Sequence, residues 1–343
     1  MKESDPAPQF DHQYYRALRI GIGFLLCSLM ACFGTLSYYL LRAAEVALLR
    51  NDISSTYMLI NQSVNADFTR IVDAADVVNN LFGNAIENNY GGIFPNLTLP
   101  GFESTVNSLR HLSGLEFIAY SPLINNTTRT SWEAYAKENV GLLNGPLSLI
   151  TSTANGISNI TVLRQKVRDT GHIDGSPYPT VLLPVWQVVP IYNQADIVMV
   201  DFHALVGNGR DAIDRVLATK KPYITEAPHL LQPSDDLRPE GVIFSPILSM
   251  KSGNPIIGLF TGGFGWDNIF NNITLSPIYI VLVTEDSTFT FNLDNGHIKL
   301  QGKGNLLNHV IHLISFSRSF CLTDFTVIFY STSDRRFARH GLR

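Results

Sequence analysis

The sequence has little cysteine and little charge. Only three of its 343 residues are cysteines, and Cys27 and Cys32 lie within an apolar run, which leaves Cys321 alone outside it. A disulfide framework within a globular domain is therefore excluded. Asp, Glu, Lys and Arg make up 16% of the chain, against roughly 25% in average soluble proteins. The apolar run accounts for part of this deficit, and the rest of the chain is apolar-rich.

Sequence motifs of catalytic and nucleotide-binding sites are also lacking. The glycine-rich stretch Thr261–Gly265 has neither the GxGxxG spacing nor the Lys-Ser/Thr ending of a phosphate-binding loop, and no GxSxG elbow occurs. His309 and His312 have no third metal ligand nearby in the sequence. No Lys/Arg run accompanies the net charge of −4. We therefore expect no catalytic domain, cofactor, metal site or nucleic-acid partner.

Residues 20–41 form an apolar run without a charged residue. At 1.5 Å per residue, a helix of this length covers the ~30 Å hydrocarbon core of a bilayer. Arg19 and Arg42 flank the run, and Tyr38 and Tyr39 suit the membrane interface. A cleaved signal peptide is the competing interpretation, but its apolar region spans only about 7–15 residues. The run predicts a single membrane-spanning helix.

The orientation of this helix is predicted from glycosylation sequons, because the flanking positive charges are nearly balanced. Every N-x-S/T sequon follows the apolar run. We therefore expect residues 1–19 to be cytoplasmic and the bulk of the chain to be extracellular or lumenal. The candidate glycosylation sites are Asn61, Asn96, Asn125, Asn126, Asn159 and Asn272.

Residues 43–90 carry apolar side chains at steps of three or four, from Val46 to Phe82, and contain no proline. This pattern predicts one long amphipathic helix. Two interpretations stay open and are compatible. The stripe packs against the protein's own domain, or it forms a stalk that pairs with a second subunit in a homodimer.

After Gly91-Gly92, prolines and glycines separate short runs rich in β-formers. The runs predict strands at 115–120, 180–190, 241–249, 255–264, 278–284 and 287–293, and helices at 131–139, 210–219 and 266–272. We expect an α+β fold with antiparallel sheets, arranged as tandem PAS-like modules. The expected domains are a tail 1–19, a transmembrane helix 20–41, a stalk helix 43–90, a distal module 91–205, a proximal module 206–306 and an atypical tail 307–343.

Aromatic residues lie on or next to the predicted sheet elements. Tyr120, Trp186 and Phe202 are candidate ligand-binding residues, because an aromatic-walled pocket suits a small ligand. Ordinary core packing is the alternative for each of them.

Several segments resemble the extracellular CHASE-like sensory region of receptor-type guanylate/adenylate cyclases of the diatom kind. The resemblance covers roughly residues 20–306, and its pieces are Leu99–Ile124, Ser131–Asn139, Leu182–Pro190, Lys221–Ala227, Pro255–Ile273 and Phe289–Leu306. It implies a membrane-anchored sensor that binds a small ligand and signals to a nucleotide cyclase.

The sequence departs from that family pattern in three places. Glu285-Asp286-Ser287 replaces an expected Cys-containing segment, no second membrane helix follows, and the cyclase domain is missing. Residues 310–330 contain His312, Arg318 and Asp324, which makes them a poor membrane span. We expect the tail to reflect a truncated or mis-spliced gene model.

Two other functions remain open at this point. A membrane-tethered structural or adhesive glycoprotein would also fit six sequons and a chain without catalytic motifs. An extracellular hydrolase would require two of the carboxylate or histidine side chains to meet in a cleft.

Overall fold

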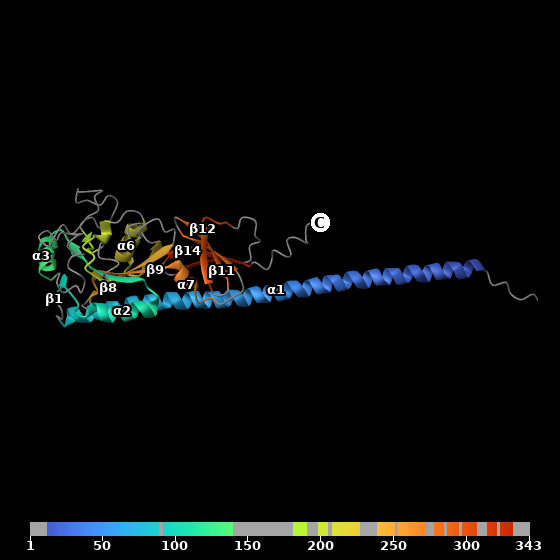
Figure 1. The fold of residues 1–343 in the computed structure, drawn as a ribbon, viewed down its shortest axis with the longest axis horizontal. Coiled ribbons are helices and arrows are strands. Elements are labelled where there is room, and N and C mark those ends of the chain that lie inside the picture. The colour runs from blue at the N-terminus through green and yellow to red at the C-terminus, as the bar shows by residue number, and fades with distance from the viewer. Residues whose placement is uncertain are drawn as a thin grey trace, which may run out of the picture. The chain divides into compact units, whose positions relative to one another are not determined.

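The computed structural model describes residues 12–88, 92–139, 181–190, 198–204, 208–226, 239–250, 253–271, 273, 278–284, 287–294, 297–306, 314–320 and 323–331. By its internal contacts the chain forms two compact units, residues 1–58 and residues 59–343. Figure 1 shows the ribbon with its elements labelled.

The first unit consists of the N-terminal part of helix α1, which runs from His12 to Glu87 over 76 residues. Its segment Tyr14–Leu48 is long and apolar enough to cross a membrane, and none of the side chains of this segment is buried. In the core helix of a soluble protein, most of these side chains would be buried. The predicted span at 20–41, which is uncharged, therefore lies inside one exposed stretch of helix.

The second unit begins where the apolar stripe of α1 becomes buried. Its side chains on one face are 0–6% exposed, at the steps of three or four that a helical face requires: Ile60, Val64, Phe68, Ile71, Ala75, Val78 and Phe82. By contrast, Val46 is 55% exposed and Met58 is 65% exposed. The stripe thus packs against its own domain from Ile60 onward. Pairing with a second subunit stays a prediction for the part before Ile60.

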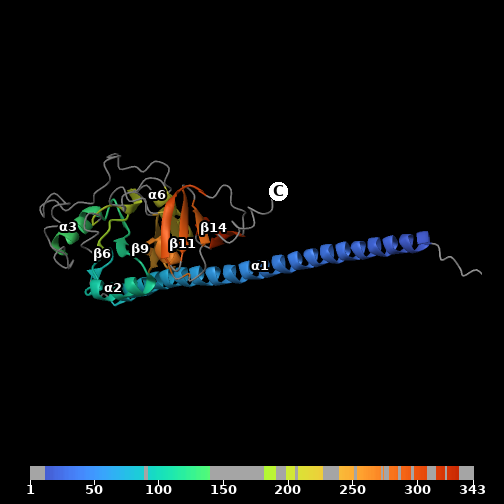
Figure 2. The same ribbon diagram turned by 45° about the vertical axis from the view of Figure 1, so that its right-hand side comes forward.

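A five-stranded antiparallel sheet forms the centre of the second unit (Figure 2). It contains β3 (Phe117–Pro122), β6 (Gln187–Val189), β7 (Tyr223–Glu226), β8 (Glu240–Leu248) and β9 (Ile256–Gly265). The spatial order is β6-β3-β9-β8-β7. Numbered along the chain, this is the order 2-1-5-4-3. The α+β class with antiparallel sheets is confirmed.

The two faces of this sheet pack against different helices. Tyr120 and Phe264 share one face, and α1 covers it: the Phe82 ring stacks on Tyr120 at 3.8 Å, and the Phe68 ring meets Phe264 at 6.1 Å. On the opposite face, Phe202 of the short helix η4 (Phe202–Ala204) meets Phe244 at 6.4 Å. We call these two sides of the first sheet the α1 face and the η4 face.

The glycine-rich stretch Thr261–Gly265 is part of strand β9. Residues 261–265 lie inside the strand, in the middle of the sheet. A Cβ on Gly263 would collide with the ring of Phe117, its partner on β3. The glycines therefore let aromatic rings lie flat on the neighbouring strand.

The remaining elements surround this sheet. The α-helices are α2 (Phe102–Ser113), α3 (Arg129–Asn139), α6 (Asn208–Thr219) and α7 (Trp266–Phe270). Two short strand pairs complete the set: β1 (Gly92–Ile93) with β2 (Asn96–Leu97), and β4 (Ile124–Asn125) with β5 (Val181–Leu182). Helix α2 was missed by the sequence analysis, although Gly114, at φ 74°, ends it as a left-handed C-cap.

A second antiparallel sheet contains β10 (Ile278–Val283), β11 (Thr288–Asp294), β12 (His297–Lys303), β13 (Ile314–Phe320) and β14 (Thr323–Ser331), in the order β12-β11-β10-β14-β13. Aromatic contacts join it to the first sheet, since Phe270 of α7 meets Phe291 of β11 at 5.6 Å.

Two predictions about domains were wrong. The expected boundary between residues 205 and 206 runs through the first sheet, because β9 pairs with β3 and joins β8 and β7 to the strands that precede the boundary. The expected tail 307–343 contributes β13 and β14, and β14 pairs directly with β10. Short-range sequence patterns did not show these long-range pairings.

Replacing Phe82 with alanine tests the packing of α1. Phe82→Ala removes a fully buried ring and should lower the free energy of unfolding by about 3–5 kcal/mol. Val77→Ala on the same helix removes a side chain that is 41% exposed, and should change it by less than about 0.5 kcal/mol. Denaturant unfolding of the full chain in detergent measures both. Equal effects would contradict the packing of α1 on the sheet.

Candidate functional site

The η4 face of the first sheet carries the candidate site. In the strand register, Ala119 of β3 pairs with Thr261 of β9, which in turn pairs with Phe244 of β8. Ser121 lies two residues beyond Ala119 and so points to the same face. All four side chains are 0% exposed. Of these four residues, only Ser121 and Thr261 carry a polar group.

These two hydroxyls are buried without a hydrogen-bond partner. Neither Ser121 Oγ nor Thr261 Oγ1 has a donor or acceptor within hydrogen-bonding reach. Such a group costs about 1–3 kcal/mol, and native proteins rarely leave one without a reason. Because Ser121 pairs with Leu259, it is a diagonal neighbour of Thr261 on the adjacent strand. Two unmet hydrogen-bonding groups therefore lie side by side in an apolar surface.

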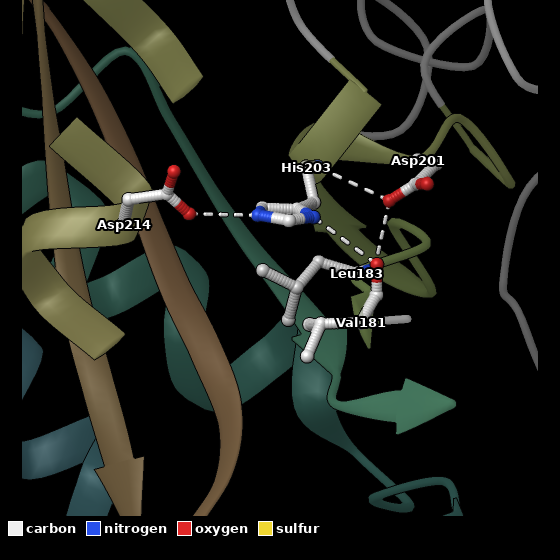
Figure 3. A network of polar contacts seen from close by, with 5 residues as sticks. All are labelled: Val181, Leu183, Asp201, His203 and Asp214. Atoms are coloured by element: carbon white, nitrogen blue, oxygen red, sulfur yellow. Dashed lines mark hydrogen bonds and ion pairs between the residues drawn. The ribbon is translucent and has the colours of Figure 1, made fainter. Parts of the chain in front are cut away.

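A buried histidine fixes the elements beside this face (Figure 3). The His203 side chain is fully buried; its Nε2 lies 2.8 Å from Oδ1 of Asp214 on α6, and its Nδ1 lies 3.1 Å from the carbonyl oxygen of Val181 on β5. A carbonyl only accepts, so Nδ1 carries a proton. The Nε2 contact then also needs a proton, on the imidazole or on the carboxyl group. His203 thus ties η4, α6 and β5 together.

Asp201 supports the same segment from its other side. Its Oδ1 accepts hydrogen bonds from the backbone N–H groups of Leu183 (2.8 Å) and His203 (3.1 Å). Met199 N donates to Val185 O at 2.7 Å, and Val185 N donates to Val200 O at 3.0 Å. Phe202 is therefore held over Phe244 by a rigid local frame.

The three predicted ligand-binding aromatics do not form one wall. Tyr120 lies on the α1 face, and burial raises the pKa of its hydroxyl far above the ordinary value. Phe202 lies on the η4 face. Trp186 precedes β6 and packs on Trp132 of α3 at 5.7 Å, and its Nε1 donates to Thr98 Oγ1 at 2.8 Å. All three are at most 1% exposed, as core side chains are.

Sequence reasoning missed Ser121, Thr261, His203 and Asp214. A single serine and a single threonine in strands carry no local signal, because only the register shows that they share a face. His203 offered one signal, since it stands between apolar residues in the stretch Phe202–Val206. Within the described residues, no group of three or more His, Cys, Asp or Glu side chains could hold a metal ion. His309 and His312 lie outside them.

The sequons differ in accessibility. Asn126 is exposed, whereas Asn96 Oδ1 is buried without a partner. Asn125 Oδ1 accepts hydrogen bonds from Thr127 and Thr128, and Asn61 Oδ1 accepts one from Asn65 Nδ2. Asn159 and Asn272 lie outside the described residues. Among the described sequons, Asn126 is the best placed for modification.

No protein-family model matches the chain, and no curated protein matches its sequence significantly. Among solved structures, the periplasmic domain of RsbU from Chlamydia trachomatis is similar. The TM-score is 0.40 at 9% sequence identity, and the match covers 87% of this chain and 99% of that one.

The threonines of the two sheets provide a matched test of the unmet hydroxyl. Thr290 is as buried as Thr261, but its Oγ1 donates to Gly304 O (2.7 Å) and accepts from Leu306 N (3.2 Å). Thr290→Val should lower the free energy of unfolding by about 1–3 kcal/mol, because it leaves Gly304 O and Leu306 N without this hydrogen-bond partner. Thr261→Val should leave it unchanged or raise it by about 1 kcal/mol. Calorimetry of both variants measures the two changes in the free energy of unfolding. If Thr261→Val destabilises as much as Thr290→Val, the hydroxyl has a partner in solution.

Proposed function

We propose that the chain is a membrane-anchored extracytoplasmic sensor module that binds a small ligand at the first sheet and passes the change to a signalling partner through α1. The observation that carries this proposal is the continuity of α1. The same helix contains the apolar segment Tyr14–Leu48 and the buried residues from Ile60 to Phe82. A change in the sheet would therefore act on the helix that enters the membrane.

The sheet contacts α1 through side chains and through the backbone. Beyond the Phe82–Tyr120 stack, Leu248 N at the end of β8 donates to Asn79 Oδ1 at 2.7 Å. A Cβ on Gly83 would lie 3.5 Å from Leu248 O, so the backbones approach closely. Movement of β8 would therefore be transmitted directly to α1.

The output of the sensor belongs to the same proposal. The sequence resemblance points to a nucleotide cyclase as the effector, carried by a partner or by a longer form of the chain. The exposed stripe of α1 that includes Val46 is proposed to pair with a second copy, because paired helices can report a shift or rotation across a membrane. Residues 1–19 would face the cytoplasm.

The proposed orientation predicts where glycans are attached. When the full chain is expressed in eukaryotic cells, Asn126→Gln should remove one glycan, seen as a mobility shift that glycosidase treatment abolishes. Asn96→Gln should leave the mobility unchanged, because the side chain is partly buried and its Oδ1 is enclosed by the protein. A chain that carries no glycan on Asn126 would contradict the proposed orientation.

Ligand binding and helix response are tested together in the full chain in nanodiscs. A library of charged and uncharged metabolites is screened for stabilisation, where a ligand at 100 times its Kd contributes about 2.7 kcal/mol. Each compound that stabilises is then added to a cysteine-free background (C27S, C32S, C321S) carrying Val46→Cys, and disulfide cross-linking is measured. Ala44→Cys, on another face of the same helix, is the control.

The proposal expects at least one compound to stabilise the chain and to change the cross-linking of Val46→Cys but not of Ala44→Cys. If no compound stabilises the protein, or if stabilising compounds leave cross-linking unchanged, a structural or adhesive role replaces that of a sensor.

A further inference from the structure

We propose that Ser121 and Thr261 form the polar floor of a binding site for a small uncharged molecule on the η4 face. This inference rests on the proposed sensor function and names the class of its ligand. Both hydroxyls are fully buried, both lack a partner, and both lie on adjacent central strands of one sheet. Buried polar groups without a partner call for an explanation, and a bound molecule that hydrogen-bonds to both hydroxyls provides one.

The surroundings of the two hydroxyls define the shape of the site. Ala119 is the direct cross-strand partner of Thr261 and lies two residues before Ser121, so the smallest side chain of the row borders both polar groups. Phe244 flanks Thr261 on the other side and carries Phe202 above it. The hydroxyls therefore border a small residue, and an aromatic pair forms one wall.

The charges of the face define the class of ligand. The register places only uncharged residues in the rows around the two hydroxyls: Phe117, Val188, Val242, Pro246, Leu259 and Gly263. A carboxylate or an ammonium group would meet no charged side chain of these rows, at a high cost of burial. Each hydroxyl can donate one hydrogen bond and accept others. A carbonyl, amide or alcohol group on a compact apolar body satisfies both hydroxyls.

An ordered water molecule is the competing occupant. A buried water needs two to four polar partners, typically about three. Ser121 and Thr261 supply two, and the side chains around them in the register are apolar apart from the hydroxyls. A ligand that adds its own apolar contacts to Phe202 and Phe244 suits this surface better than water alone.

The test compares neutral probes with their charged counterparts on the full chain in nanodiscs. Benzamide, nicotinamide and benzyl alcohol are the neutral probes, and benzoate, nicotinate and benzylamine are the charged ones; ligand-observed NMR measures binding. The proteins are the wild type, the double variant Ser121→Ala/Thr261→Val, and Thr225→Val. Thr225 lies on the same face but on the edge strand β7, which makes it the matched control.

We expect neutral probes to bind the wild type and Thr225→Val equally, and to bind the double variant at least 10-fold more weakly. Charged counterparts should bind none of the three proteins. Equal binding of neutral and charged probes, unchanged binding to the double variant, or no binding of any neutral probe would overturn the assignment. So would a crystal structure in which one water joins the two hydroxyls. A charged library compound that stabilises the double variant as well as the wild type would overturn this site and leave the sensor function standing.

Discussion

The burial of α1 against one face of the first sheet is the interaction on which the structure depends. A helix with an apolar stripe and a sheet with two apolar faces each need a partner that removes them from water. The Phe82–Tyr120 stack and the cluster of Phe68, Phe264 and Trp266 provide this closure on one side of the sheet. The opposite face is then the one that remains for η4, α6 and whatever the two hydroxyls bind.

The two faces of the first sheet differ in chemistry. On the α1 face, aromatic rings interlock, and the Tyr120 hydroxyl is buried without a hydrogen-bond partner. On the η4 face, the hydroxyls of Ser121 and Thr261 are buried without a partner, while His203 and the Oδ1 atom of Asp201 make hydrogen bonds that hold η4 and α6 in place. Packing thus ties one face to α1, and the proposed ligand site lies on the other face.

Local patterns predicted much of this fold. The membrane-length run, helix α3, helix α6 and the antiparallel pair β8–β9 follow from periodicity, capping residues and turn residues, which act over a few positions. The position of a strand in a sheet is decided by partners far along the chain. For that reason the pairing of β14 with β10 and the extent of the first sheet to Gly265 were not predicted.

Local patterns predicted the candidate site less well than they predicted the fold. The apolar stripe of α1 is continuous in sequence from Val46 to Phe82, but among its described side chains Val46 is exposed and those from Ile60 onward are buried. Tyr120 was predicted to bind a ligand from its residue type, whereas its parity on β3 turns it toward α1. Its neighbour Ser121, on the other parity, carries the unmet hydroxyl. One residue along a strand separates the two faces.

Native-state hydrogen exchange of the full chain tests the central claim most directly. If α1 and the first sheet form one packed body, the amides of residues 60–86 and those of β3 and β9 should exchange through the same opening, with a common free energy. Denaturant should lower the protection of both sets together. If residues 60–86 exchange through a separate opening of much lower free energy than β3 and β9, α1 is not packed on the sheet and cannot carry its changes to the membrane.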